Sequence, residues 1–336
     1  FAAGIENGRN SSAYGALSNA GVTLNNKNSA SVEQTENFNY TWDNQIDIKK
    51  TFNEVHDFSA LLLQSLYSNV DQSSFSSSNG MPFDTGFYNL GAGVQSSYNL
   101  ATMYSKNSLS SYAVRINYTF NNKYLITASN RWDGASVLAE GKKWENFPSL
   151  ALAWKVGQES FLKDSKTVSD LKLRASIGYT GNNNVAPYTT QQLLDQQTFY
   201  ANASNLVAGW QSANLANQAL TWEKTRELNF GLDFGFLSNR ITGSVDVYDR
   251  LSDKLIYQQQ LPLETGWGRT YANVGSVSNK GVEVLLTTKN IQTEKVNWET
   301  TFTFTKNVNQ LESIYGQDQV DDIGNNLFIG KPLNSN

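Results

Sequence analysis

Aromatic residues that could stack on a sugar ring lie in two predicted loops, residues 180–220 and 252–274. Sugar C–H faces stack on flat rings while amide side chains bridge the hydroxyl groups, so this combination is typical of carbohydrate binding. The alternative for each ring is packing within its own loop or a place in an aromatic girdle at a membrane interface. The candidate substrate-binding residues are Trp210, Trp267, Tyr271, Tyr188 and Tyr200, with Phe199 beside the last of them.

Charged residues fall on the polar sides of predicted strands or at their ends. A charged side chain that faces lipid near mid-membrane costs about 2–4 kcal/mol. We therefore expect a lumenal charge ladder, in which arginines pair with carboxylates along the inner wall of a barrel. Its expected members are Arg115, Arg131, Arg174, Asp133, Asp233 and Glu283. Gly134, next to Asp133, is interpreted as a bulge or close-approach residue rather than a ligand contact.

Metal and catalytic chemistry have little support in the composition. The chain has no cysteine and one histidine, His56, which removes thiolate sites and most histidine-based metal sites and catalytic triads. Asp318, Asp321 and Asp322 leave Ca²⁺ in a loop open, but they lack the spacing of known calcium loops, so a solvated acidic loop is favoured. No nucleophile–base arrangement is evident, and we expect neither an enzyme nor a resident cofactor. The net charge of −4 without a basic block argues against a nucleic-acid partner.

The elements that would position these residues alternate strictly between apolar and polar. In residues 223–236, Leu228, Phe230 and Phe234 occupy one face and Asn229 and Asp233 the other. The pattern resumes in residues 241–248 after a tight turn and recurs along most of the chain, on strands of about ten residues or more. Long alternating strands joined by turns of unequal length are typical of a transmembrane β-barrel.

About ten strands are predicted, in up-and-down order. Short connections are expected at residues 52–56, 121–122, 237–239 and 289–295, and long loops at 67–107, 133–146, 180–220 and 252–274. A connector of middling length, 157–170, falls on the short-turn side. In outer-membrane barrels the short turns are periplasmic and the long loops extracellular. The predicted strands are 37–50, 57–66, 111–120, 123–131, 147–156, 171–179, 223–236, 241–251, 275–288 and 296–305.

The predicted fold class is therefore all-β, a transmembrane antiparallel up-and-down β-barrel of which this chain is a part. Residues 1–36 do not have the pattern expected of a periplasmic start, and the N-terminus has neither an initiator Met nor a signal peptide. An open sheet edge is unfavourable in lipid, so the remaining strands are expected from the rest of a longer polypeptide. The expectation for domains is that residues 1–336 form part of one barrel domain, without a plug domain or the last strands.

Several motifs in order along the chain resemble those of SusC/RagA-type TonB-dependent transporters. Residues 115–125 (RINYTFNNKYL) and 131–136 (RWDGAS) resemble the family's "R-x-N-Y … K-Y-L … R-x-D-G-S-S" stretch. Residues 171–182 (LKLRASIGYTGN) resemble "L-K-L-R-x-S-x-G-x-T-G-N". Further islands are 144–149 (WENFPS), 159–162 (ESFL), 222–225 (WEKT), 229–233 (NFGLD), 273–275 (NVG) and 279–283 (NKGVE).

The resemblance implies a 22-stranded barrel in the outer membrane of a Gram-negative bacterium, with a plug domain and a SusD-like surface lipoprotein as its lid. It also implies energy from the TonB–ExbB–ExbD complex and a cargo of oligosaccharide, less often peptide. Contact between the wall arginines and the plug is a further possibility that the resemblance raises. Two other classes remain open: a passive porin-like barrel, and a soluble carbohydrate-binding sandwich that would not need detergent.

Overall fold

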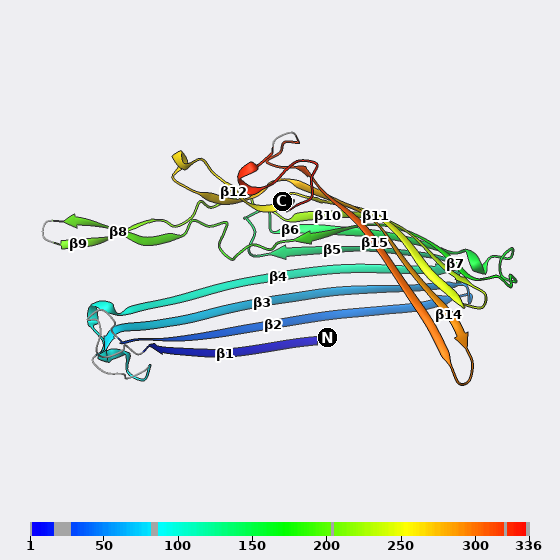
Figure 1. Cartoon of the computed structure of the whole chain (residues 1–336), viewed down its shortest axis with the longest axis horizontal. Coiled ribbons are helices and arrows are strands. Elements are labelled where there is room, and N and C mark those ends of the chain that lie inside the picture. Colours follow the sequence, from blue (N-terminus) through cyan, green and yellow to red (C-terminus); the bar gives the residue numbers. More distant parts are fainter. Residues whose placement is uncertain (1, 17–27, 82–86, 203–204, 319–320, 334–336) are drawn as a thin grey trace. The chain divides into compact units, whose positions relative to one another are not determined.

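The computed structural model describes residues 2–16, 28–81, 87–202, 205–318 and 321–333, with side chains described from residue 29 onward except in 197–208. Eleven antiparallel strands follow one another in a single sheet, in the order β1-β2-β3-β4-β5-β6-β7-β10-β11-β14-β15 (Figure 1). Two separate two-stranded hairpins, β8–β9 and β12–β13, complete the described strands. The sheet strands are β1 (Ala2–Ala16), β2 (Asn28–Phe52), β3 (His56–Met81), β4 (Asn99–Phe120), β5 (Tyr124–Ala135), β6 (Trp144–Lys155), β7 (Val168–Asn182), β10 (Glu223–Phe236), β11 (Ile241–Asp253), β14 (Ser276–Gln292) and β15 (Asn297–Ser313).

The hairpins and short helices lie in the connections. The hairpin strands are β8 (Leu194–Asn202), β9 (Asn205–Ser212), β12 (Ile256–Gln260) and β13 (Arg269–Asn273). The 3₁₀ helices are η1 (Leu90–Ala92), η2 (Gln95–Ser97), η3 (Val156–Gln158), η4 (Leu263–Thr265) and η5 (Ile323–Asn325). Among the described residues, no helix is long and apolar enough to cross a membrane.

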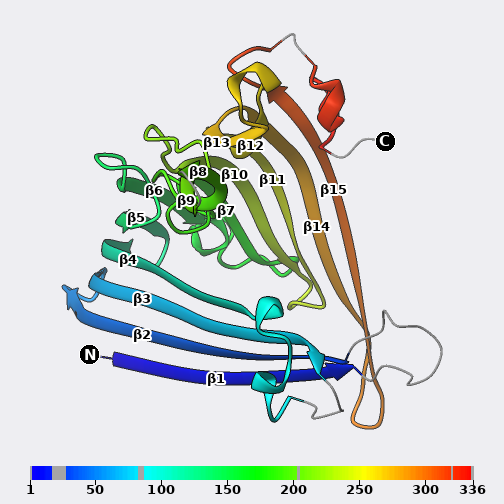
Figure 2. The same ribbon diagram turned by 90° about the vertical axis from the view of Figure 1, so that its left-hand side faces the viewer.

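The fold class predicted from alternation is confirmed, and all ten predicted strands are present. Tight turns set the register at one end of the sheet. Asn121 and Asn122 both have φ near +50°, as a two-residue type I′ hairpin requires. From the turn at Leu237–Arg240, β10 and β11 pair so that Gly231 lies opposite Asp246 and Phe230 opposite Val247. Figure 2 shows β14 and β15 side by side at the other end of the strand order.

One loop assignment made from the sequence was wrong. In residues 67–107, β3 continues to Met81 and β4 begins at Asn99, so most of the predicted loop is strand. The predicted connections 180–220 and 252–274 each contain a two-stranded hairpin, and β1 and the start of β2 lie within residues 1–36, where no strand was predicted. The strand parts of residues 67–107 have polar residues at many positions on both faces, so they lack the apolar side that the sequence criterion required.

The described contacts divide the chain into two compact units. One comprises Phe1–Asn44 and Ser65–Ser110, and the other comprises Gln45–Gln64 and Ser111–Asn336. Strands β2, β3 and β4 contribute residues to both. In the first unit β1 pairs with β2 over their shared length, from Ala2 opposite Asp43 to Ala16 opposite Ser29.

Large apolar side chains in the second unit are exposed rather than buried. Phe230 is 63% exposed, and Leu173 and Leu152 are nearly half exposed, all on the apolar face of their strands. An exposed apolar surface of this extent would be an aggregation liability in water, whereas in lipid it is the favourable outward side of a barrel wall. The sheet therefore has an apolar face, which we define by Leu228, Phe230 and Phe234, and a polar face, defined by Asn229 and Asp233.

A small conventional core lies beyond the strand ends. Leu138, Leu220 and Trp222 are almost fully buried. The Trp222 indole N–H donates to the Lys143 carbonyl at 2.8 Å, which ties the 135–143 loop to the start of β10. This core fixes the long loops on the side where β10 begins.

An aromatic row marks the opposite end of the strands. His56, Phe120, Tyr124 and Trp154 follow one another with ring centroids 5.0, 6.3 and 6.4 Å apart. Aromatic rings in such a row are typical of the girdle at a membrane–water interface. The turns at residues 53–55 and 121–123 adjoin this row.

Candidate functional site

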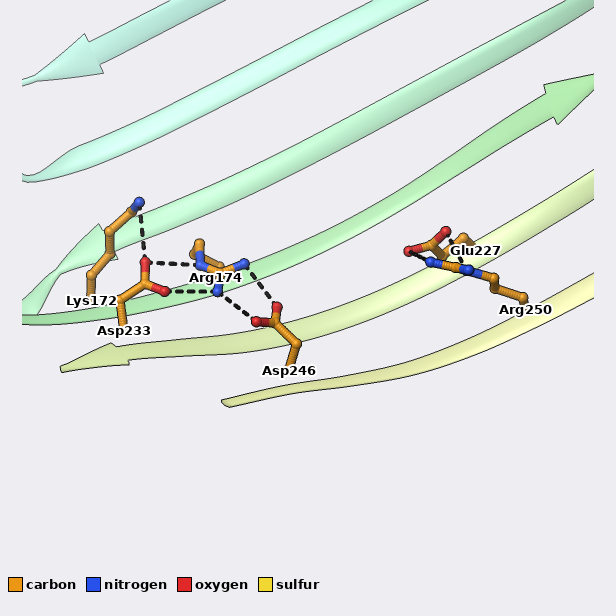
Figure 3. A network of polar contacts seen from close by, with 6 residues as sticks. All are labelled: Lys172, Arg174, Glu227, Asp233, Asp246 and Arg250. Atoms are coloured by element: carbon orange, nitrogen blue, oxygen red, sulfur yellow. Dashed lines mark hydrogen bonds and ion pairs between the residues drawn. The ribbon is translucent and has the colours of Figure 1, made fainter. Parts of the chain in front are cut away.

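A network of ions on the polar face joins β7, β10 and β11 (Figure 3). The Arg174 guanidinium donates to both carboxylate oxygens of Asp233, at 3.0 and 2.8 Å, and to both of Asp246, at 2.9 and 3.0 Å. The Lys172 ammonium lies 3.4 Å from Asp233. Both carboxylates are thus bound in the two-pronged geometry that the planar guanidinium favours.

Gly231 makes this network possible. It lies directly between Arg174 on β7 and Asp246 on β11 in the strand register. A Cβ at Gly231 would come within 2.5 Å of the Arg174 guanidinium carbon. Because glycine leaves that space empty, the arginine lies flat across β10 and reaches an aspartate two strands away.

A second ion pair lies on the polar face of β4 and β5. Arg131 donates through Nε to Asp133 at 2.8 Å, and its Nη2 donates to the Ser111 hydroxyl at 2.8 Å. Asp133 is only 8% exposed. Arg115 lines the same polar depression as this pair but makes no ion pair with any described residue.

A third group lies further toward the start of β10. Arg250 donates to Glu227 at 2.7 Å (Figure 3) and stacks on the Tyr248 ring at 4.6 Å. Tyr248 in turn lies flat over Gly281, where a Cβ would come within 2.5 Å of the phenol ring, and its hydroxyl is 3.2 Å from the Asn307 amide oxygen. The same arrangement of a long side chain over a cross-strand glycine therefore recurs.

The first unit carries an amide cluster on the polar face of β2 and β3. The Asn39 amide donates to Asn37 at 2.6 Å, Asn37 donates to Asn69 at 2.9 Å, and Asn69 donates to Asp71 at 2.6 Å. Asn37 also donates to Asp71. Amide and carboxylate groups held in this way can exchange hydrogen bonds with hydroxyl or peptide groups of a passing solute.

The predicted charge ladder is thus distributed as separate pairs. Arg131 lies with Asp133, and Arg174 with Asp233, while Glu283 stands opposite Asp246 in the register without an ion pair among the described residues. Sequence reasoning missed Asp246, Lys172 and Gly231. The signal was available, because the turn at 237–240 sets Gly231 opposite Asp246 and a glycine between two charged positions leaves room for a long side chain.

The predicted sugar-stacking residues are spread over separate loop elements. Trp210 lies on β9 and is 64% exposed, and Trp267 is partly exposed between η4 and β13. Tyr271 lies on β13, where its carbonyl accepts a hydrogen bond from the Asn217 amide at 2.8 Å, and Tyr188 occupies a turn with φ of 67°. Tyr200 lies on β8, but its side chain and that of Phe199 are outside the described residues.

Asp321 and Asp322, in the acidic loop after β15, are held by hydrogen bonds within that loop. Asp322 accepts from the Tyr315 hydroxyl at 2.5 Å and from Asn325, and Asp321 accepts from the Ile329 backbone at 2.7 Å. Burial and the hydrogen bond to Asp322 raise the pKa of Tyr315. In the part of the chain that the structure describes, no group of three or more acidic or histidine side chains is arranged to hold a metal ion.

Glu159, in the connector between β6 and β7, ties the aromatic row together. It accepts from the Lys123 ammonium at 2.8 Å, the Tyr124 hydroxyl at 2.7 Å and the Trp154 indole at 3.0 Å. These hydrogen bonds, in that order, lower the pKa of Glu159 to about 2. The carboxylate therefore stays ionised and fixes the polar tips of the girdle.

Comparison with known proteins assigns the family. Residues 3–336 match the family described as TonB dependent receptor-like, beta-barrel. The chain belongs to this family. TonB-dependent receptor P39 of Formosa agariphila is 34% identical over 299 residues, which cover 88% of this chain and 28% of that protein. TonB-dependent receptor SusC of Bacteroides thetaiotaomicron is 37% identical over 221 residues, covering 65% of this chain and 22% of that protein.

A solved structure of the RagAB peptide importer in its closed-closed state superposes with a TM-score of 0.88 at 24% identity, over 98% of this chain and 36% of that one. The SusC/RagA-type resemblance is confirmed, and the chain is barrel wall from the outer membrane of a Gram-negative bacterium. The matched family is one of receptors and not of enzymes. This chain spans less than a third of the length of the curated relatives.

Proposed function

We propose that this chain is the wall of a TonB-dependent transporter that imports oligosaccharides across the outer membrane. The polar face carries the supporting observation: saturated ion pairs, amides and hydroxyls line it, as suits a passage for a neutral, hydroxyl-rich solute. The similarity to SusC, a TonB-dependent receptor, supports the TonB-dependent part of the proposal. The exposed ring of Trp210 and the partly exposed ring of Trp267 are proposed as the first contacts of the cargo outside the barrel.

The partners of this function are a SusD-like lipoprotein lid and the TonB–ExbB–ExbD energy complex. Residues 1–336 belong to a single barrel domain in this proposal. The outer edges of β1 and β15 are then covered by further strands of the same polypeptide, because unpaired backbone groups in lipid cost several kcal/mol each.

Peptide import is the second candidate, favoured by one observation. The solved structure that superposes with a TM-score of 0.88 is titled as a peptide importer. Backbone amides of a peptide would use the same hydrogen-bonding wall, so the wall alone does not separate the two cargoes.

Cargo retention by the intact receptor in detergent tests the proposal. A panel of neutral oligosaccharides and a panel of short peptides are offered to the wild type and to a Trp210→Ala/Trp267→Ala double variant. We expect the wild type to retain oligosaccharide and the double variant to lose at least about tenfold in affinity, since ring stacking contributes about 1 kcal/mol or more per site.

The matched control is Leu263→Ala, because Leu263 is 84% exposed on the same hairpin as Trp267 but has no ring. Retention of peptides alone would replace the oligosaccharide proposal by the peptide one. Uptake that persists in cells without TonB would show a passive pore instead.

A further inference from the structure

A pocket lined by three cationic side chains lies near the start of β10 and the end of β11, at the edge of the apolar face. Lys224, Arg226 and Lys254 line it together with two carboxylates, Glu145 and Asp253. Counting these five groups leaves an excess of one positive charge. Nothing in the proposed transport function uses this pocket.

The strand alternation places the cations at the rim of the lipid-facing surface. Arg226 lies on the same face of β10 as Leu228 and Phe230, and it stands opposite Tyr179 on β7 and Leu251 on β11. Arg226 lies four positions before Phe230, which is about 13 Å along a strand. The pocket thus lies at the height where apolar side chains give way to polar ones, on the side of the long loops.

Arg226 is incompletely satisfied there. Its Nε is buried and has no hydrogen-bond partner, and Arg226 makes no ion pair with any described residue. Lys224, in contrast, lies 3.2 Å from Glu145 and 5.2 Å from the centroid of the Tyr179 ring. One cation of the pocket is therefore fixed by the protein, while the neighbouring guanidinium lacks an acceptor.

We propose that this pocket binds a phosphate group of a glycolipid in the outer leaflet. A phosphate accepts from a guanidinium in two-pronged geometry, and a phosphate in this pocket would give the Arg226 guanidinium the acceptor that the described residues do not supply. The acyl chains of the same lipid would lie along the exposed apolar face below, next to Phe230. Free phosphate shares the headgroup chemistry but would gain nothing from that apolar surface.

Native mass spectrometry of the intact receptor in detergent separates these sources. The probes are lipid A with both phosphates, the same lipid with its phosphates removed, and inorganic phosphate. We expect the phosphorylated lipid to bind at least about tenfold more tightly than either other probe, because charge-assisted hydrogen bonds to Arg226 require the phosphate.

A Lys224→Gln/Arg226→Gln double variant should lose this preference, and Arg226→Lys, which keeps the charge but removes the Nε donor, should lose part of it. The matched control is Lys289→Gln/Lys295→Gln, which removes two exposed cations at the other end of the strands, one near the end of β14 and one in the turn between β14 and β15. If the double variant does not fold, Arg226→Lys alone carries the test. Equal binding of the two lipids, tightest binding of inorganic phosphate, or an unchanged preference in the folded variants would overturn the proposal.

Discussion

The two faces of β10 differ in how their charged side chains are paired. On the polar face, Arg174 crosses the strand to two aspartates and every oxygen of both carboxylates receives a donor. On the apolar face, the exposed side chain of Phe230 is favourable only in contact with lipid. Around Arg174 the charges of the polar face are thus satisfied within the chain, whereas the buried Nε of Arg226, at the rim of the apolar face, has no hydrogen-bond acceptor among the described residues.

Placing a charge on the apolar face should give the largest effect. Phe230→Lys is expected to destabilise the inserted barrel by about 2–4 kcal/mol, because the ammonium would face the hydrocarbon. The folded fraction after outer-membrane extraction, read from heat-dependent mobility on a gel, measures this. Asn229→Lys, one residue away on the polar face, is the control and should cost less than about 1 kcal/mol; equal losses would refute the assignment of faces.

Removing the arginine of the saturated network should rank second. Arg174→Met leaves Asp246 without its cation, and we expect a loss of about 2–3 kcal/mol, less than for a fully buried pair because these side chains are 19–30% exposed. Arg250→Met is the matched control, since its pair with Glu227 is more exposed and should contribute under about 1 kcal/mol. Denaturant unfolding in detergent compares the two variants, and the account fails if Arg250→Met costs as much.

Substitution of Gly231, which lies beneath Arg174, should cost somewhat less stability. Gly231→Ala would push the Arg174 guanidinium from its position, at a cost of about 1–2 kcal/mol. In the Arg174→Met background the same substitution should cost clearly less, because the displaced group is gone. Gly268→Ala, with no atom within 4 Å of the added carbon, is the control. Additive losses in the double variant would show that Gly231 acts independently of Arg174.

The smallest expected effect on stability is that of substituting Glu159, which holds the aromatic row at the short-turn end of the strands. The folded-state pKa of Glu159 is lowered to about 2 from an ordinary value of about 4.3, so its contribution is complete above about pH 4.3 and disappears as the pH falls toward 2. Glu159→Gln should therefore lower the unfolding temperature at neutral pH and make little difference near pH 2. A gap between wild type and variant that widens in acid would contradict this assignment.

Strands could be predicted from the sequence where contact with lipid requires apolar and polar residues to alternate, and could not be predicted where this requirement is absent. In strands such as β10 and β11, apolar and polar side chains must alternate because one face contacts hydrocarbon. The residue types of Phe230 and Asp233 therefore predict which face each lies on. The end of β3 and the start of β4 have water-compatible residues on both faces. The composition of Ser73–Gly80 therefore indicates a loop, although this segment is strand. The structure of these strand parts comes from backbone pairing, which leaves no periodic trace in the side chains.

The candidate site divides in the same way. Arg174, Asp233, Arg131 and Asp133 were picked out from strand patterning, and the structure brings each arginine to its aspartate. Asp246 required the register of a hairpin as well. The loop aromatics could be named but not assembled, because loop conformation depends on contacts that no local pattern encodes.

The alternation of environments along β10 tests the central claim most directly. Nitroxide labels are attached to single cysteines placed in turn at Glu227, Leu228, Asn229 and Phe230 of the receptor in lipid vesicles, with collisions against oxygen and a water-soluble nickel complex measured at each. Because a side chain at Gly231 would displace Arg174, the second label on the polar face is placed at Glu227 instead of Gly231. We predict that the labels at Leu228 and Phe230 collide mainly with oxygen, and those at Glu227 and Asn229 mainly with nickel. Equal nickel accessibility at all four positions would contradict a wall with lipid on one side and a polar passage on the other.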